Sequence, residues 1–345
     1  MPDSEMYLKL QPMLANVVPD VELRYKAELA EEINRLKVER NAVILGHNYM
    51  EPALYHSIPD FVGDSLYLSR KAAETDKDII IFCGVEFMAE TAKILNPSRT
   101  VLLPAEKAGC SLAESITASD VRQLKKRFPG VPVVTYVNTY ADVKAESDIC
   151  CTSGNAVAVV ESLDSDRVIF LPDEYLAANV ARETGRHIIF PTTGSKGLQF
   201  ETDLDYQMVG WRGRCEVHEK FTLEDIKTVR DQFPDVIILA HPECSPEVVE
   251  ASDFSGSTTA MIRHVENSDA PHFLLLTECS MGDNIIAANP DKPMLRLCMV
   301  RCPHMNQITL EDTLKSLQLL QYKIEVPEEI RLKALQAVER MIAIG

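Results

Sequence analysis

The sequence lacks the two features that would direct a chain to or through a membrane. Its first segment, 1–20, contains no basic start followed by an apolar core, so we expect no signal peptide. No apolar run approaches the roughly 20 residues that a membrane-spanning helix needs. We therefore expect a cytoplasmic protein that does not act at a membrane.

The chain also carries no excess of positively charged residues. The 52 Asp and Glu residues outnumber the 35 Lys and Arg residues, which gives a formal net charge of -17 at pH 7. A nucleic-acid-binding surface needs clustered Lys and Arg, so the composition argues against a nucleic-acid partner. Small anionic substrates remain compatible with it, because a pocket can be locally positive inside an acidic protein.

The nine cysteines lack the C-x-x-C pattern that is typical of many metal and redox sites. The nearest spacing to it is C-x-x-x-C at Cys298 and Cys302. An odd number of cysteines in a chain expected in the cytoplasm disfavours a disulfide framework. It indicates metal, cluster or catalytic use instead.

Three cysteines share the pattern C-x6-T-x-x-D. The threonine and the acid predict a helix N-cap, which is a structural role. A cysteine that only packs in the core has no reason to recur at the same place, so the pattern indicates a shared metal or cluster site. The three copies are Cys110, Thr117 and Asp120; Cys215, Thr222 and Asp225; and Cys302, Thr309 and Asp312.

Short β-branched runs alternate with helical stretches, which is typical of an α/β protein. The runs are apolar throughout, as expected for parallel strands that are covered on both faces. We predict strands at 42–46, 78–83, 100–104, 132–137, 167–171, 187–191, 236–240, 272–276 and 294–298.

These strands fall into three sets of three, and the third strand of each set leads to one of the repeated cysteines. We therefore predict three homologous three-layer αβα domains with parallel sheets around a pseudo-threefold axis. The middle repeat is longer, which we attribute to an insertion near 197–211. The predicted units are an N-terminal helical segment at 1–40, repeats at 41–128, 129–233 and 234–320, and a C-terminal helix at 321–345.

Polar groups recur at the end of the first strand of each set. They are His47, Tyr136 and His241, and Tyr49, Asn138 and Glu243 lie nearby and offer further acid/base or hydrogen-bonding groups. Because ligands bind at the carboxyl ends of parallel strands, we expect these groups to share one cavity. A small hydroxyl cluster follows each of them, with Ser65, Ser153 and Thr258, which favours anion binding at a helix start over simple N-capping.

Three thiolates without an obvious fourth ligand fit two kinds of metal centre. One is zinc with a histidine or water as fourth ligand, and the other is an iron–sulfur cluster with one open iron. The zinc centre would suit a hydrolase. A cluster could also serve a redox sensor that is not an enzyme, but a sensor does not explain the matched hydroxyl and histidine sets.

Nine short segments together resemble quinolinate synthase, an enzyme of de novo NAD biosynthesis from aspartate. The resemblance extends from about residue 40 to 315, and the combination is specific although each segment alone is weak. The segments are GHNY, GDSL, GVEFMAETAKIL, TYVNTYADVKAESD, TSGNA, CEVHEKF, HPEC, GST and CPHM.

The resemblance implies a [4Fe–4S] cluster held by Cys110, Cys215 and Cys302. It implies condensation of iminoaspartate with dihydroxyacetone phosphate to quinolinate, with loss of phosphate and water. The iron without a protein ligand would act as a Lewis acid and help a hydroxide to leave. A transient contact with the enzyme that supplies iminoaspartate is a further expectation.

The resemblance also implies a cavity lined by the strand-end and hydroxyl residues. We expect Tyr49, the His241–Glu243 pair and Tyr136 to act in catalysis, and Ser65, Ser153 and Thr258 to hold the phosphate and carboxylates. The residues expected to bind substrate are His47, Ser65, Tyr136, Asn138, Ser153, His241, Glu243 and Thr258.

Two features depart from the family pattern. Some members carry C-x-x-C-x-x-C at the third ligand, whereas this chain has only Cys298 and Cys302. Cys302 matches the ligand, so we expect Cys298 to be spare and a regulatory disulfide to be in doubt. The segment 197–211 is not general in the family, and it is expected to cover the cavity, to contact a neighbouring molecule or to form an ordinary surface loop.

Overall fold

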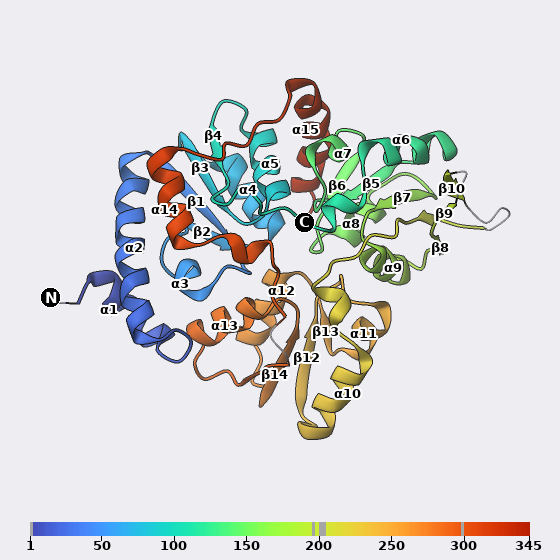
Figure 1. Ribbon diagram of the computed structural model, residues 1–345. Helices are drawn as coiled ribbons and strands as arrows, with labels where there is room; N and C mark the ends of the chain where they lie inside the picture. Colours follow the sequence, from blue (N-terminus) through green and yellow to red (C-terminus); the bar gives the residue numbers. More distant parts are fainter. Residues whose placement is uncertain (1–2, 195–196, 200–204, 298–299) are drawn as a thin grey trace.

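The chain forms three lobes around a common centre, each built on its own parallel sheet (Figure 1). The computed structural model describes residues 3–194, 197–199, 205–297 and 300–345. Each sheet takes all its strands from one of the three predicted repeats, and helices flank it. The predicted α/β architecture of three αβα units is therefore confirmed.

The first and third sheets have the same strand order, and all their strands are parallel. The two central strands of the first sheet are buried along their whole length, which explains why their sequences do not alternate. The first order is β2 (Phe61–Gly63), β1 (Ala42–His47), β3 (Ile79–Cys83) and β4 (Thr100–Leu102), and the third is β13 (Phe254–Ser255), β12 (Val236–Ala240), β14 (His272–Leu276) and β15 (Met294–Leu295).

In the second sheet, the prediction that 187–191 is the third strand of its set is wrong. β8 (Ile188–Ile189) is an edge strand, and β11 (Met208–Val209) takes the place next to β7 (Val168–Leu171) that β4 and β15 hold in their sheets. The strand that leads to Cys215 therefore lies inside the segment expected as an insertion. β5 (Val133–Tyr136) and β6 (Ile149–Cys151) complete this parallel sheet, and β9 (Thr192–Gly194) and β10 (Gly197–Gln199) form a separate antiparallel hairpin.

The strands β2, β6 and β13 are absent from the sequence-based prediction. Each is two or three residues long. A run this short shows no period that would distinguish a strand from a loop. Each of them is an edge strand beside the first strand of its set.

Two helical segments bind the lobes together. The predicted apolar face of α2 (Asp20–Glu39) is buried, with Leu23, Ala27, Ala30, Ile33 and Leu36. α15 (Glu328–Ile342) lies between the first and second lobes (Figure 1). The Asn155 side chain donates hydrogen bonds to the carbonyls of Met341 and Ile344 at its end.

The remaining helices cover the sheets. None of the helices in the described part of the chain is both long and apolar enough to cross a bilayer. They are α1 (Glu5–Leu14), α3 (Pro52–Tyr55), α4 (Ser65–Glu74), α5 (Glu86–Leu95), α6 (Ala118–Arg127), α7 (Ala141–Lys144), α8 (Ala156–Glu161), α9 (Glu174–Glu183), α10 (Leu223–Gln232), α11 (Pro246–Ala251), α12 (Thr258–Glu266), α13 (Cys279–Ala288) and α14 (Leu310–Leu319).

The threonine of each C-x6-T-x-x-D motif caps a helix, as predicted. Thr117, Thr222 and Thr309 are the N-caps of α6, α10 and α14, and each side chain accepts a hydrogen bond from the backbone N–H three residues later. In α6 and α10 the acid reaches back to the N-cap backbone and completes a capping box.

We expect Thr222→Ala to lower the free energy of unfolding by about 1 kcal/mol, because it leaves a helix-terminal N–H without its acceptor. Thr222→Ser keeps the hydroxyl and is the matched control. Urea unfolding of the metal-free protein measures both. Equal stability of Thr222→Ala and the unsubstituted protein would show that the cap does not contribute.

Candidate functional site

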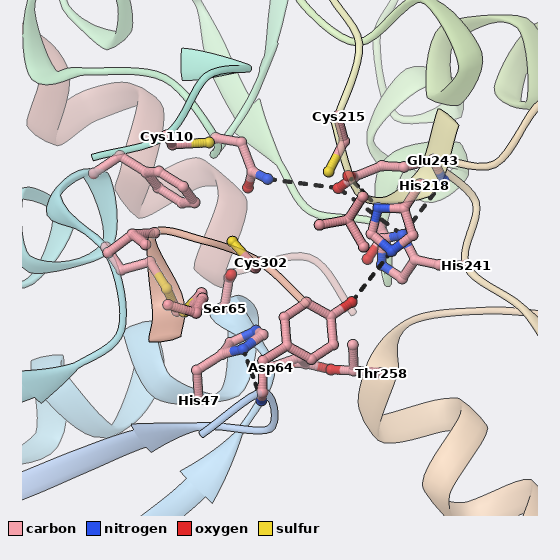
Figure 2. A pocket seen from close by; sticks show the side chains of 18 of the residues that line it. His47, Asp64, Ser65, Cys110, Cys215, His218, His241, Glu243, Thr258 and Cys302 are labelled. Carbon is pink, nitrogen blue, oxygen red and sulfur yellow. Dashed lines mark hydrogen bonds and ion pairs between the residues drawn. The ribbon is translucent and has the colours of Figure 1, made fainter. Parts of the chain in front are cut away.

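All twelve residues predicted for the site line one cavity at the centre of the three lobes (Figure 2). The cavity has a volume of about 660 Å³. The carboxyl ends of the first strands and the three cysteine loops point into it, as the strand-end rule predicts. The twelve residues are His47, Tyr49, Ser65, Cys110, Tyr136, Asn138, Ser153, Cys215, His241, Glu243, Thr258 and Cys302.

The three cysteine loops have the same backbone design. Each cysteine precedes a short 3₁₀ helix, and its carbonyl accepts a hydrogen bond of 3.0 Å from the N–H four residues later. Each thiol also accepts hydrogen bonds from the N–H groups two and three residues later. The N–H donors are Leu112 and Ala113 for Cys110, Val217 and His218 for Cys215, and His304 and Met305 for Cys302.

Burial keeps these thiols protonated when no cation is present. It raises the pKa of Cys110 to about 12 and that of Cys302 to about 11, although the N–H groups oppose it. The pKa of Cys215 is also raised well above its ordinary value, by burial first and the Glu243 charge second. A bound cation would reverse this balance, because coordination favours the thiolate.

Of the three repeated cysteines, Cys215 is the one that belongs to a compact group of metal-binding donors among the described residues. Two sulfurs on one zinc ion lie no more than about 4.6 Å apart, twice the zinc–sulfur bond length. Among the described residues, the group of three donors within 4.8 Å of one another contains Cys215 but neither of the other two ligand cysteines. A cluster offers a separate iron to each cysteine and does not require such close sulfurs.

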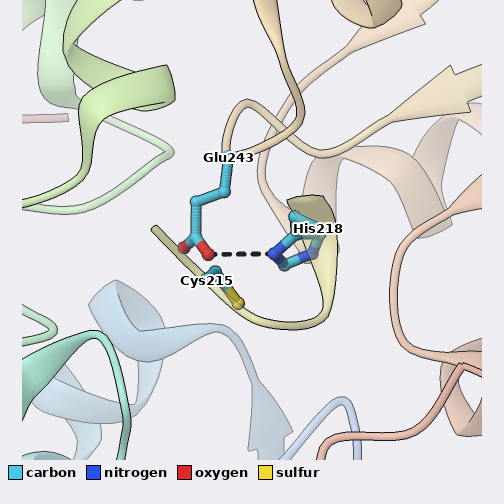
Figure 3. A group of neighbouring side chains, drawn as sticks. All are labelled: Cys215, His218 and Glu243. Atoms are coloured by element: carbon cyan, nitrogen blue, oxygen red, sulfur yellow. Dashed lines mark hydrogen bonds and ion pairs between the residues drawn. The ribbon is translucent and has the colours of Figure 1, made fainter. Parts of the chain in front are cut away.

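That group of donors consists of Cys215, His218 and Glu243 (Figure 3). His218 Nδ1 donates to Glu243 Oε2 at 2.9 Å, because an ionised carboxylate can only accept. The two side chains therefore satisfy each other in the structure. They form a buried acid/base pair beside the cysteine, and a single ion there would have to break it.

A continuous hydrogen-bond network runs from this pair across the cavity. The Tyr136 hydroxyl donates to Glu243 Oε1, and Asn138 lies 3.5 Å from the same oxygen. On the other side, His218 Nε2 lies 2.9 Å from Thr277 Oγ1, which lies 2.6 Å from the Tyr49 hydroxyl. The network joins groups from all three lobes.

His47 and His241 are matched neutral imidazoles. The Nδ1 of His47 accepts from the backbone N–H of Tyr49 at 3.2 Å, and that of His241 accepts from Glu243 at 3.3 Å. Burial lowers the pKa of His47 to about 4 and that of His241 to about 3. Each ring can therefore direct a neutral Nε2–H towards a ligand.

Glu243 is ionised, and the two tyrosines are not. Burial on its own would raise the pKa of Glu243, but the histidines and the hydrogen bonds from His218 and Tyr136 outweigh it and keep the pKa below the ordinary value. Burial and the Glu243 charge raise the pKa of Tyr49 and Tyr136 well above 10.0.

Ser65 and Thr258 are not the N-caps of the helices that they begin. Asp64 caps α4 and Ser257 caps α12, so the capping role falls to the residue before Ser65 and Thr258. The Ser257 hydroxyl donates to Asp64 at 2.9 Å and joins the first and third lobes. No Lys or Arg lines the cavity in the described part of the chain, so an anion would depend on hydroxyls and N–H groups there.

Sequence reasoning missed three groups that contribute to the cavity or its network. His218 and Asp64 line the cavity, and Thr277 joins His218 to Tyr49. His218 lies three residues after Cys215, but Ala113 and Met305 hold that position in the other two loops, so the repeat gave no signal for it. Cys298 lies outside the described residues.

The neutral histidines predict an acid-sensitive fold. Their folded pKa values lie below the unfolded value, so their contribution to stability is complete above about pH 6.5 and is lost as the pH falls towards 4. We expect His47→Asn to reduce the loss of unfolding free energy between pH 7 and pH 5 by about 1–2 kcal/mol. Urea unfolding of the metal-free protein tests this, and equal losses would contradict it.

Comparison with known proteins agrees with this geometry. A family model described as "Quinolinate synthetase A protein" matches residues 31–343. The chain is 50% identical over 335 residues to "Quinolinate synthase 2" of Mesorhizobium japonicum, which covers 97% of both chains. It is 51% identical over 335 residues to "Quinolinate synthase" of Agrobacterium fabrum, covering 97% of this chain and 91% of the relative. It is also 51% identical over 314 residues to "Quinolinate synthase" of Xylella fastidiosa, covering 91% and 86%. The chain belongs to the quinolinate synthetase A family.

Proposed function

We propose that the protein is a quinolinate synthase that condenses iminoaspartate with dihydroxyacetone phosphate, with loss of phosphate and water, in de novo NAD biosynthesis. The observation that carries the proposal is the convergence of three cysteine loops and three strand-end polar pairs on one cavity. Family membership supports the same activity.

In this proposal Cys110, Cys215 and Cys302 hold a [4Fe–4S] cluster. Their donor set fits it because thiolate sulfur is the usual ligand of such clusters and each loop supplies two N–H groups to its sulfur. The cluster would supply an iron without a protein ligand as a Lewis acid. The Cys215–His218–Glu243 group supports a zinc hydrolase as the second candidate.

The protein's own groups divide the proton chemistry between them. Glu243 is ionised and buried, so it is the proposed proton acceptor. Tyr136 and Tyr49 keep their protons and are the proposed donors. The Nε2–H of His241 would orient a substrate carbonyl or carboxylate without adding charge.

We propose that Ser65, Ser153 and Thr258 bind the phosphate and carboxylates, with the helix starts beside them. Asn48 donates to the Thr258 hydroxyl at 2.9 Å and fixes its position. The dipole of α12 and its first N–H groups add favourable potential for an anion at this wall of the cavity. Asn138 and His47 complete the proposed binding set.

The wider assignments are proposals of the same kind. We propose that the protein acts in the cytoplasm, on small molecules and on neither nucleic acid nor membranes. A transient contact would deliver iminoaspartate from the enzyme that makes it. The repeat boundaries at 41–128, 129–233 and 234–320 are proposed as domain boundaries.

The first test is quinolinate formation by anaerobically purified, cluster-loaded protein that is given iminoaspartate and dihydroxyacetone phosphate. The expected result is quinolinate, with activity lost on exposure to air. A protein with an intact cluster that forms no quinolinate would overturn the proposed reaction and would favour the sensor.

Substitution of the ligands tests the metal centre. We expect Cys110→Ala, Cys215→Ala and Cys302→Ala each to remove the brown cluster absorbance, because each sulfur would hold a different iron. Cys298→Ala is the control and should keep the cluster. A brown, active Cys302→Ala protein would contradict the ligand set, and a colourless protein with one zinc would favour the hydrolase.

Glu243→Gln tests the proposed proton acceptor. We expect turnover to fall by at least about 100-fold, because the amide keeps the shape but cannot take up a proton. The exposed Glu247→Gln is the matched control. Steady-state assays of both cluster-loaded variants give the comparison, and unchanged turnover of Glu243→Gln would exclude the role.

A further inference from the structure

Side chains next to the three ligand cysteines meet one another outside the cavity. Ser111 follows Cys110, Glu216 follows Cys215, and His304 lies two residues after Cys302. The Ser111 hydroxyl donates to Glu216 Oε1 at 2.9 Å, and His304 Nε2 lies 3.2 Å from the same oxygen. One carboxylate oxygen therefore joins the cysteine loops of all three lobes.

None of these three side chains lines the cavity, so they have no direct contact with a substrate there. The Glu216 side chain is 36% exposed and that of His304 is 23% exposed. They lie at the outer side of the cysteine loops. Their effect on the site must pass through the backbone that carries the sulfurs.

The contact between Glu216 and His304 connects the third cysteine loop to the other two. Among the described residues, this 3.2 Å contact between His304 Nε2 and Glu216 Oε1 is the polar side-chain contact that joins the second cysteine loop to the third. The first and second loops have another link, because the Trp211 indole N–H donates to the Ser115 carbonyl at 2.9 Å. The other ring nitrogen of His304 is buried and has no partner among the described residues, so Glu216 alone orients the ring.

The His304 backbone connects this contact to the metal ligand. Its N–H is one of the two that bond the Cys302 sulfur. A shift of the imidazole would therefore move an N–H that positions the thiol. Ser111 and Glu216 are each bonded covalently to the residue that carries the ligand sulfur.

We propose that Glu216 is a positioning residue that locks the three cysteine loops together and so determines how firmly they hold the iron–sulfur cluster. The inference rests on the proposed function for the identity of the metal centre, whereas the contacts of Glu216 with Ser111 and His304 do not depend on it. Glu216 meets both Ser111 and His304 through one oxygen, so a glutamine oxygen can take the same position and an alanine cannot.

The first readout is the rate at which an iron(II) chelator removes iron from the cluster-loaded protein without oxygen. We expect Glu216→Ala to release iron about tenfold faster, because it removes the Ser111 hydrogen bond and the contact with His304. Glu216→Gln should restore the rate to within about threefold, because its carbonyl oxygen can accept the Ser111 hydrogen bond and lie against His304. The control is Glu219→Ala, which removes an exposed carboxylate from the same loop.

A double variant tests the route through His304. If Glu216 acts by orienting His304, Glu216→Ala combined with His304→Ala should release iron no faster than Glu216→Ala alone. Additive acceleration would overturn this route. Near-ultraviolet circular dichroism of each variant verifies that it is folded.

The second readout uses the metal-free protein, so that it does not depend on the cluster. Alkylation of Cys110, Cys215 and Cys302 by iodoacetamide, followed by peptide mass spectrometry, should be several-fold faster in Glu216→Ala than in Glu219→Ala. Unchanged alkylation together with unchanged iron release would overturn the inference. A wild-type protein that assembles no cluster would contradict the proposed function. The alkylation rates would then test by themselves whether Glu216 positions the three cysteine loops.

Discussion

The site depends on how each ligand sulfur is held at the start of a 3₁₀ turn. Two N–H groups per loop point at the thiol, and an N-capped helix fixes the end of the turn. Burial opposes the thiolate and the N–H groups favour it, so each loop is stable as a thiol and prepared for a cation. Because the three loops come from three lobes, the proposed metal site would exist only when the lobes are assembled.

The cavity opposite the cysteines is arranged around one buried charge. Glu243 stays ionised because His218 and Tyr136 donate to it, while the neighbouring His47 and His241 stay neutral. Asp64 also lines the cavity but is only partly buried, so Glu243 is the buried carboxylate of its wall. The arrangement gives one proton acceptor among several donors, which suits a condensation with successive losses of water.

The sequence predicted the twelve lining residues because the repeat marks equivalent positions in each lobe. Cys110, Cys215 and Cys302 were recognisable through their capping threonines, which are local signals. His218, Thr277 and Glu216 were not, because their partners lie in other lobes and no local pattern records such contacts. β11 was missed for a different reason, since two residues show no period.

The central claim is that three lobes jointly present three sulfurs to separate irons and leave one iron without a protein ligand. Mössbauer spectroscopy of ⁵⁷Fe-loaded protein, with and without quinolinate, tests it most directly. The account predicts a cluster in which one iron site alone changes when the ligand is added. A spectrum in which every iron keeps its parameters, or a protein that retains a single ion in place of a cluster, would contradict it.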